Sequence, residues 1–247
     1  MNFTRIVFLT AVMLPATFAQ GGRGGGPPLA PKAAAPFDPT GYWVSEIVDE
    51  WRFRITPQKG DIPYLPINAE ARRVANAWDP EKDDSSGNAC RAYGAVGVMQ
   101  RPGRLHITWE DDTTLKMDLD AGSQTRILRF GAPQQAVGDP TWQGNSTARW
   151  QVVQQRGMPQ GPRGGTLVVV TNNMKPGYLR KNGVPYSERA VQTEYINYVT
   201  GQQKDEYLVI TAMVDDPVYL TGPFIRSYQF KKEKDGSRWD PTPCWNK

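Results

Sequence analysis

The sequence is poor in the residues that build metal and nucleophilic sites. Its 247 residues include one histidine, His106, and two cysteines, Cys90 and Cys244. A zinc site that needs two or three histidines cannot be built, and any Ser-His-Asp or Cys-His site would have to use His106. No nucleophile motif accompanies this histidine, so a surface or cavity-lining role is the simpler interpretation. The acids of residues 79–88 lack the spacing of a calcium loop. We expect no metal and no cofactor.

Strong charge of one sign and long hydrophobic runs are also missing. The formal net charge is +4 with acids and bases mixed along the chain, which does not indicate nucleic-acid binding. The longest apolar run, residues 6–14, is well short of the roughly 20 residues of a membrane-spanning helix. It follows Arg5 and precedes small residues that end at Ala19, which is typical of a cleavable signal peptide. We predict cleavage after Ala19, a periplasmic or secreted protein and no stable membrane insertion; an uncleaved anchor is the alternative.

The composition divides the remaining chain into two parts. Residues 20–37 are rich in Gly, Pro and Ala without apolar periodicity, which predicts a disordered leader. Residues 38–247 are long enough for one domain with a sizeable core. The Gly-rich stretches show no phosphate-binding pattern between a strand and a helix.

One segment has helical periodicity. Ala71, Val74, Ala75 and Trp78 recur at helical spacing after Asn68, a residue suited to cap a helix. This predicts one short helix over residues 68–78.

Most of the other segments alternate with a period of two. We predict strands over residues 42–56 (one strand, or two with a break at 49–50), 104–110, 113–118, 124–130, 147–153, 166–171, 189–199, 207–214 and 225–231. Sequential strands with short connections favour an all-β fold, an antiparallel up-and-down sheet that curls into a lipocalin-like barrel to remove its edges. A β-sandwich is the alternative.

The two cysteines predict a disulfide. In an oxidising compartment, Cys90 and Cys244 are most simply bonded to each other, which would tie the C-terminal tail to the domain. Metal ligation or a catalytic thiol is the competing interpretation.

Aromatic residues are abundant, with eight Trp and ten Tyr. A curled sheet lined by such rings suits an apolar or aromatic ligand, although ordinary core packing explains the same residues. The tryptophans in or beside predicted strands are the candidate ligand-binding residues: Trp43, Trp51, Trp109, Trp142 and Trp150.

Two similarities support an exported β protein. The opening Gly41-Tyr42-Trp43 resembles the Gly-x-Trp start of lipocalin-type barrels. Nearly the whole mature chain resembles a family of uncharacterised exported proteins of acidobacteria and proteobacteria. The matching segments are residues 68–72, 78–80, 142–146, 149–150, 165–169, 185–187, 194–195 and 215–217, together with Cys90. The resemblance implies export, a β fold and a disulfide, and no particular reaction.

Three functional hypotheses follow. The first is an exported module that binds a small apolar or aromatic ligand in a Trp- and Tyr-lined cavity. The second is a cofactor-independent lyase, isomerase or hydrolase that uses Tyr186, Glu194, Tyr195 and Arg149 as polar strand residues. The third is an envelope-interaction or structural protein, which would expose a large apolar patch.

Overall fold

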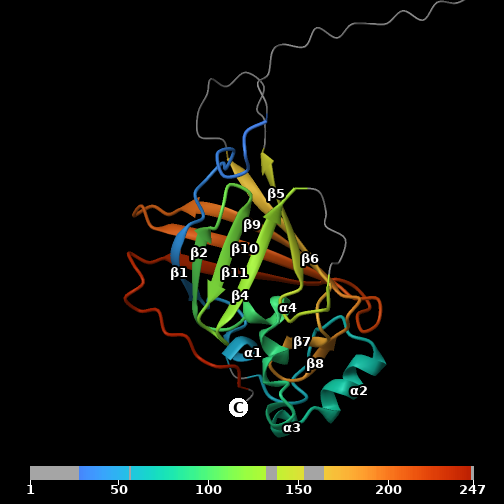
Figure 1. The fold of residues 1–247 in the computed structure, drawn as a ribbon. Helices are drawn as coiled ribbons and strands as arrows, with labels where there is room; N and C mark the ends of the chain where they lie inside the picture. The colour runs from blue at the N-terminus through green and yellow to red at the C-terminus, as the bar shows by residue number, and fades with distance from the viewer. Residues whose placement is uncertain (1–27, 56, 132–137, 153–163, 246–247) are drawn as a thin grey trace, which may run out of the picture.

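The protein forms a closed barrel of nine strands. A computed structural model describes residues 28–55, 57–131, 138–152 and 164–245. The neighbouring strands around the barrel are β1-β11-β10-β9-β6-β5-β4-β3-β2, and β1 pairs with β2 to close it (Figure 1). The strands are β1 (Gly41–Glu46), β2 (Arg104–Trp109), β3 (Thr114–Leu119), β4 (Gln124–Phe130), β5 (Asn145–Val152), β6 (Gly165–Asn172), β9 (Val191–Thr200), β10 (Glu206–Asp215) and β11 (Phe224–Lys232). The predicted all-β barrel is confirmed.

One neighbouring pair departs from the antiparallel pattern. β4 and β5 run parallel, with Arg129 opposite Thr147, while the other pairs around the barrel are antiparallel. An odd number of strands cannot alternate in direction all the way around a closed ring, so at least one parallel pair is unavoidable. The connection between β6 and β9 also leaves the barrel and forms a separate ribbon, β7 (Gly177–Arg180) with β8 (Val184–Tyr186), which the sequence did not predict.

Inward-facing side chains from all nine strands fill the barrel. They include Trp43 of β1, Met117 of β3, Val169 of β6, Ile210 of β10 and Phe230 of β11, all almost fully buried. A barrel of this size is either filled by side chains or holds one small ligand, and here the inward-facing side chains are almost fully buried against one another. The barrel interior is therefore a packed core.

Helices cover one end of the barrel (Figure 1). They are α1 (Trp51–Ile55), α2 (Ala69–Ala77), α3 (Pro80–Ser85), the 3₁₀ helix η1 (Ala89–Tyr93) and α4 (Ala95–Val98). The predicted helix is confirmed as α2, and the Asn68 side chain accepts a hydrogen bond from the Ala71 amide as an N-cap. The short helices α1, α3, η1 and α4 contain too few turns for their periodicity to be read from the sequence.

The predicted strand over residues 42–56 is correct only in its first half. Trp51, Phe53 and Ile55 alternate like a strand, yet they lie in α1, where Trp51 and Ile55 are exposed. The buried residue is Arg54, whose guanidinium lies 5.3 Å from the centre of the Tyr228 ring. Burial of Arg54 against the barrel end overrides the local β preference.

The other end of the barrel is covered by the N-terminal segment. The predicted disordered leader spans residues 20–37; residues 20–27 lie outside the described part, but residues 28–37 pack on the barrel. The Trp150 indole donates a hydrogen bond to the Pro31 carbonyl (2.8 Å). Phe37 stacks on Tyr198 and meets Trp150 edge to face, with ring centres 5.7 and 5.3 Å apart. These aromatic contacts bury part of residues 28–37 against the barrel, which the Gly- and Pro-rich composition of the segment did not predict.

The helices in the described ranges are all short. None of them has the length and apolar character that a membrane-spanning helix requires.

Candidate ligand pocket at the helical end of the barrel

A pocket of about 650 Å³ lies where the helices meet the barrel, within the size range of small-molecule sites. Segments distant in the sequence line it: the end of α1 and the loop after it, the end of α2, η1, the loop before β2, the turns after β3 and β7, and the C-terminal tail. The lining residues are Arg54, Ile55, Pro57, Gln58, Trp78, Tyr93, Arg101, Pro102, Ala121, Lys181, Thr242 and Trp245. Ile55 and Trp245 are about half exposed and mark the mouth, whereas Trp78, Tyr93 and Arg101 are buried.

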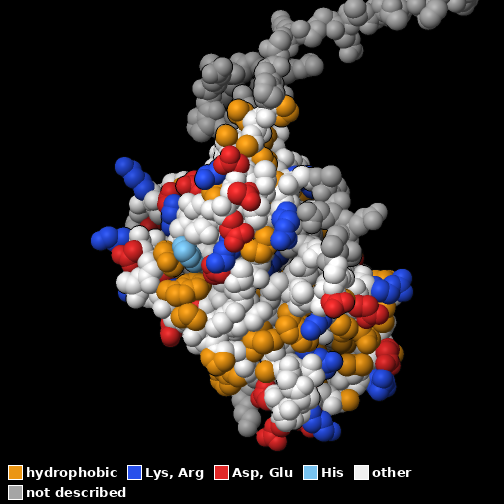
Figure 2. All heavy atoms as spheres, viewed as in Figure 1, with side chains coloured by type: hydrophobic (Ala, Val, Ile, Leu, Met, Phe, Trp, Pro, Cys, Tyr) orange, Lys and Arg blue, Asp and Glu red, His pale blue; other side chains and the backbone are white. Residues whose placement is uncertain are grey.

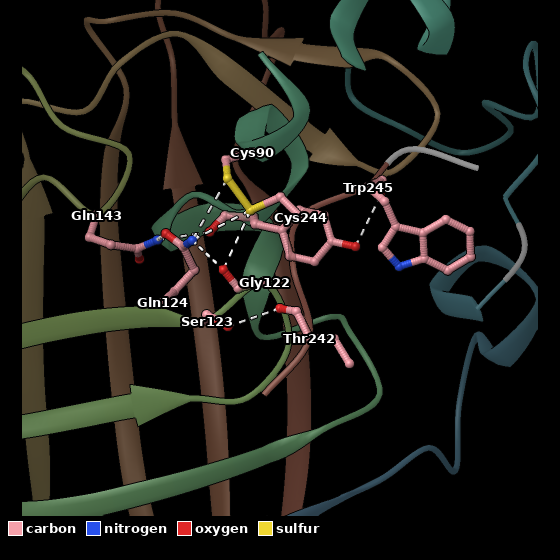
Figure 3. The surroundings of a disulfide bond; sticks show 9 residues. Cys90, Gly122, Ser123, Gln124, Gln143, Thr242, Cys244 and Trp245 are labelled. Carbon is pink, nitrogen blue, oxygen red and sulfur yellow. Dashed lines mark hydrogen bonds between the residues drawn. A yellow bond between two sulfur atoms is a disulfide. The ribbon is translucent and has the colours of Figure 1, made fainter. Parts of the chain in front are cut away.

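The disulfide holds the C-terminal wall of the pocket in place. Cys90 and Cys244 are bonded, with their Cα atoms 5.1 Å apart, which confirms the predicted pair. Figure 3 shows Trp245 immediately beyond the disulfide, with its indole directed away from the sulfur atoms. The Tyr93 hydroxyl donates to the Trp245 carbonyl (3.0 Å), and the Thr242 amide donates to the Asp120 carbonyl (2.9 Å). The tail is thus fixed by a covalent bond and by hydrogen bonds on both sides of it.

Two glycines let the aromatic walls pack closely. Gly183 has a φ of +82°, and a Cβ at this position would lie 2.2 Å from the Cβ of Trp78. Gly122 has a φ of +75°, and its Cβ would lie 2.5 Å from the Tyr93 ring. Both positions combine a left-handed backbone with a close approach, which glycine alone accepts without strain.

A buried carboxylate orients Trp78. The Trp78 indole donates to Oδ2 of Asp83 (2.9 Å), and the Tyr178 hydroxyl donates to the same oxygen (2.7 Å). Arg91 lies 3.3 Å from the other oxygen of Asp83. Burial and the bond to Asp83 raise the pKa of Tyr178 to about 12, so it stays a donor at neutral pH. Trp78 is therefore held in one orientation at the pocket wall.

Three cations line the pocket. Burial lowers the pKa of Arg101 to about 10 and that of Arg54 below its usual range, yet both guanidinium groups stay charged at neutral pH. Burial and the charge of Arg101 lower the pKa of Lys181 to about 8, although Asp84 opposes this shift. The Lys181 Nζ lies 4.1 Å from the centre of the Trp245 ring, a cation–π contact.

The five predicted ligand-binding tryptophans do not line this pocket. Trp43 is in the barrel core, and its indole donates to the Pro39 carbonyl (3.0 Å). Trp51 is 63% exposed on α1, and Trp142 lies under the Lys175 side chain. Only Trp109 and Trp150 come together, because both pack on Phe130 at the N-terminal end of the barrel, with ring centres 5.6 and 5.4 Å from it.

The four candidate catalytic residues occupy three separate environments. Glu194 faces the barrel interior and pairs with Arg126, whereas Tyr195 and Arg149 lie on the outer face. Tyr186 is fully buried between the ribbon and the helices; burial raises the pKa of its hydroxyl, which has no hydrogen-bond partner among the described residues. These residues therefore do not share one site.

A second hollow of about 640 Å³ lies at the N-terminal end of the barrel. Lys32, Phe37 and Trp109 are among its lining residues, so it includes one of the predicted tryptophans. Five of its seven lining residues belong to residues 32–40, the segment that covers this end. We take the pocket at the helical end as the candidate site because buried cations and aromatic rings converge there.

Few features of the sequence predict this pocket. Trp78 and Trp245 belong to the tryptophan excess, but they lie outside the predicted barrel strands. The one local signal for the pocket is that Trp245 directly follows Cys244, because a disulfide that fixes the tail also fixes the residue next to the cysteine. Nothing in the sequence distinguishes Arg54, Arg101 or Lys181 from the other basic residues.

Figure 2 shows apolar side chains gathered over α2 and the β7–β8 ribbon, while acidic and basic side chains are mixed over the barrel strands. In the described ranges, no three His, Cys, Asp or Glu side chains lie in an arrangement suited to a metal ion.

The sequence matches no protein-family model, and neither the curated proteins nor the solved structures contain a match to it.

Proposed function

We propose that this protein is an exported binding protein that holds a small molecule with an apolar or aromatic body in the pocket at the helical end of the barrel. The observation that carries the proposal is the convergence of Trp78, Tyr93 and Trp245 around a hollow of about 650 Å³. Small-molecule sites are hollows of this size, with mostly apolar and aromatic walls and a few polar groups.

The construction of the pocket supports this role. Its tail wall is held by the Cys90–Cys244 disulfide, and Trp78 is oriented by Asp83. Walls that are fixed in advance reduce the conformational entropy that a ligand loses on binding. The packed barrel core, by contrast, leaves the tryptophan inside it, Trp43, with a structural role.

The experiment is a fluorescence screen of aromatic acids, terpenoids and lipids against wild-type protein and two variants. We expect a saturable change in Trp emission that Trp245→Ala removes. Trp51→Ala is the matched control, because Trp51 is also more than half exposed but does not line the pocket. If no compound gives saturable binding, or if Trp245→Ala binds as wild type does, the proposed site is wrong.

The proposal of export is supported by the disulfide, which persists in oxidising compartments. The predicted signal peptide, residues 1–19, lies outside the described residues. Cell fractionation with N-terminal sequencing tests this part: we expect periplasmic or secreted protein that begins at Gln20. A cytoplasmic protein that retains Met1 would contradict it.

A further inference from the structure

The pocket is cationic as well as aromatic. Arg54, Arg101 and Lys181 line it, and no Asp or Glu is among the described residues that do. Two of these cations have an acid nearby: Asp49 lies 3.6 Å from Arg54, and Asp84 acts electrostatically on Lys181. Arg101 has no carboxylate of the described residues within 4 Å, and two other cations, Arg54 and Lys181, interact with it electrostatically.

Arg101 is the unusual member of this set. Its side chain is only 5% exposed, and both Nε and Nη2 are buried without a hydrogen-bond partner in the described part of the protein. A buried guanidinium is ordinarily paired, since an unpaired buried charge is costly. Nε and Nη2 lie on one edge of the planar group, and this edge matches the two oxygens of a carboxylate. The Nε–Nη2 edge of Arg101 therefore lacks a partner, and a negatively charged group with two oxygens would fit it.

We propose that the pocket binds an organic monoanion, an aromatic or alicyclic carboxylate, whose carboxylate pairs with Arg101 while its ring packs on the aromatic walls. This inference rests on the proposed binding function and specifies the chemical class of its ligand. A single negative charge matches the single cation without an acidic neighbour, whereas a phosphate monoester carries closer to two charges at neutral pH. Because Nε and Nη2 are shielded from water, binding includes a rotation of the guanidinium toward the ligand.

Lys181 gives the proposed binding a pH dependence. The groups acting on it include Arg101, Asp84 and the Trp245 ring, and its pKa is lowered to about 8. Below that pH the ammonium is charged and attracts the anion; as the pH rises through about 8 it loses its proton. Affinity for the carboxylate therefore falls across this range and does not vanish, because Arg101 stays charged.

The test compares matched pairs of ligands: phenylacetate, cyclohexylacetate, 2-naphthylacetate and indole-3-acetate, each with its neutral primary amide. Isothermal titration calorimetry measures binding to wild type, Arg101→Met and Lys181→Met. We expect at least one acid to bind wild type about tenfold or more tightly than its amide, the size of a charged hydrogen bond. Arg101→Met should remove most of that preference and leave the part that Lys181 supplies, and Lys181→Met should flatten the affinity between pH 7 and 9.

A matched control and a stability measurement separate binding from folding. Lys175→Met also removes a lysine that lies over a tryptophan, Trp142, but outside the pocket, and should bind as wild type does. Arg101→Met removes an unpaired buried charge, so its melting temperature should equal or exceed that of wild type. Reduced stability of Arg101→Met would assign Arg101 a structural role and overturn the inference.

The outcomes distinguish this inference from the function on which it rests. If amides bind as tightly as acids, the carboxylate specificity is wrong while the binding function stands. If no member of any pair binds, and the fluorescence screen is also negative, both are wrong.

Discussion

The Arg126 guanidinium and the Glu194 carboxylate face each other inside the barrel, 68 positions apart in the sequence. Arg126 Nη1 donates to Glu194 Oε1 (2.9 Å), Nη2 donates to Oε2, and both side chains are essentially inaccessible to solvent. Thr171 and Ser146 continue the polar contacts at this level of the barrel. The pair crosses from β4 to β9, and so it fixes two strands that are not neighbours in the sheet.

Removing one partner of this pair should be strongly destabilising. Glu194→Gln leaves the Arg126 charge buried without its counterion, and we expect a loss of about 3–5 kcal/mol in the free energy of unfolding. Urea denaturation followed by circular dichroism measures it. Glu188→Gln is the control, since Glu188 is exposed, and should change stability by less than about 0.5 kcal/mol. If the double variant Arg126→Met/Glu194→Leu is as unstable as Glu194→Gln, the unpaired charge is not the cause.

Loss of the disulfide should loosen the C-terminal tail first. Cys90→Ala/Cys244→Ala opens a loop of 154 residues, and chain entropy predicts a loss of up to about 4–5 kcal/mol. The hydrogen bonds of Thr242 and Tyr93 remain available to the tail in this variant. We expect faster hydrogen exchange over residues 240–245 than in wild type, with barrel strands still protected. Thiol titration of unreduced wild-type protein should find no free cysteine; two free thiols would contradict the pairing.

The N-terminal segment should depend on Phe37 for its attachment. Phe37→Ala removes the contacts with Trp150 and Tyr198, and we expect a loss of about 1–3 kcal/mol and earlier protease cleavage within residues 28–40. Acrylamide quenching of Trp emission should increase as Trp150 becomes accessible. Leu29→Ala, at a position that is 70% exposed, is the control and should behave as wild type. Unchanged proteolysis of Phe37→Ala would show that other contacts hold the segment.

The barrel could be predicted because its strands carry their signal locally. Leu105 and Ile107 alternate with His106 and Thr108, and this period of two reports one buried face. The α1 segment has the same period, but there a tertiary contact of Arg54 decides the conformation. The parallel β4–β5 pair follows from the odd number of strands in the closed barrel, and the sequence predicts that number, nine, when residues 42–56 are counted as one strand.

The candidate site could not be predicted to the same extent, because it is built from turns and ends of elements. Arg101, Lys181 and Trp245 come from a loop, a turn and the tail, and they meet only once the barrel has closed. One constraint was present in the sequence: Glu194 and Tyr195 are adjacent on a strand and must point to opposite faces. The four candidate catalytic residues could therefore not have shared a cavity inside the barrel.

The close packing of Gly183 on Trp78 gives a prediction about the pocket wall that needs no ligand. Gly183→Ala places a Cβ 2.2 Å from that of Trp78 on a backbone with a φ of +82°. We expect about 1–2 kcal/mol of loss from the left-handed backbone and a further 1–3 kcal/mol, approximately, from overpacking. The Trp78 ring should shift, with a change in near-ultraviolet circular dichroism.

Two other glycines separate the backbone cost from the contact cost. Gly60 has a φ of +77° with nothing within 4 Å of an added Cβ, so Gly60→Ala carries the backbone cost alone. Gly222 has open space and no left-handed backbone, so Gly222→Ala should be neutral or slightly stabilising. Thermal unfolding of the three variants should rank Gly183→Ala below Gly60→Ala and Gly60→Ala below Gly222→Ala. If Gly183→Ala and Gly60→Ala are equally stable, the Trp78 wall yields to the added methyl group and is not the rigid surface that the packing around Asp83 indicates.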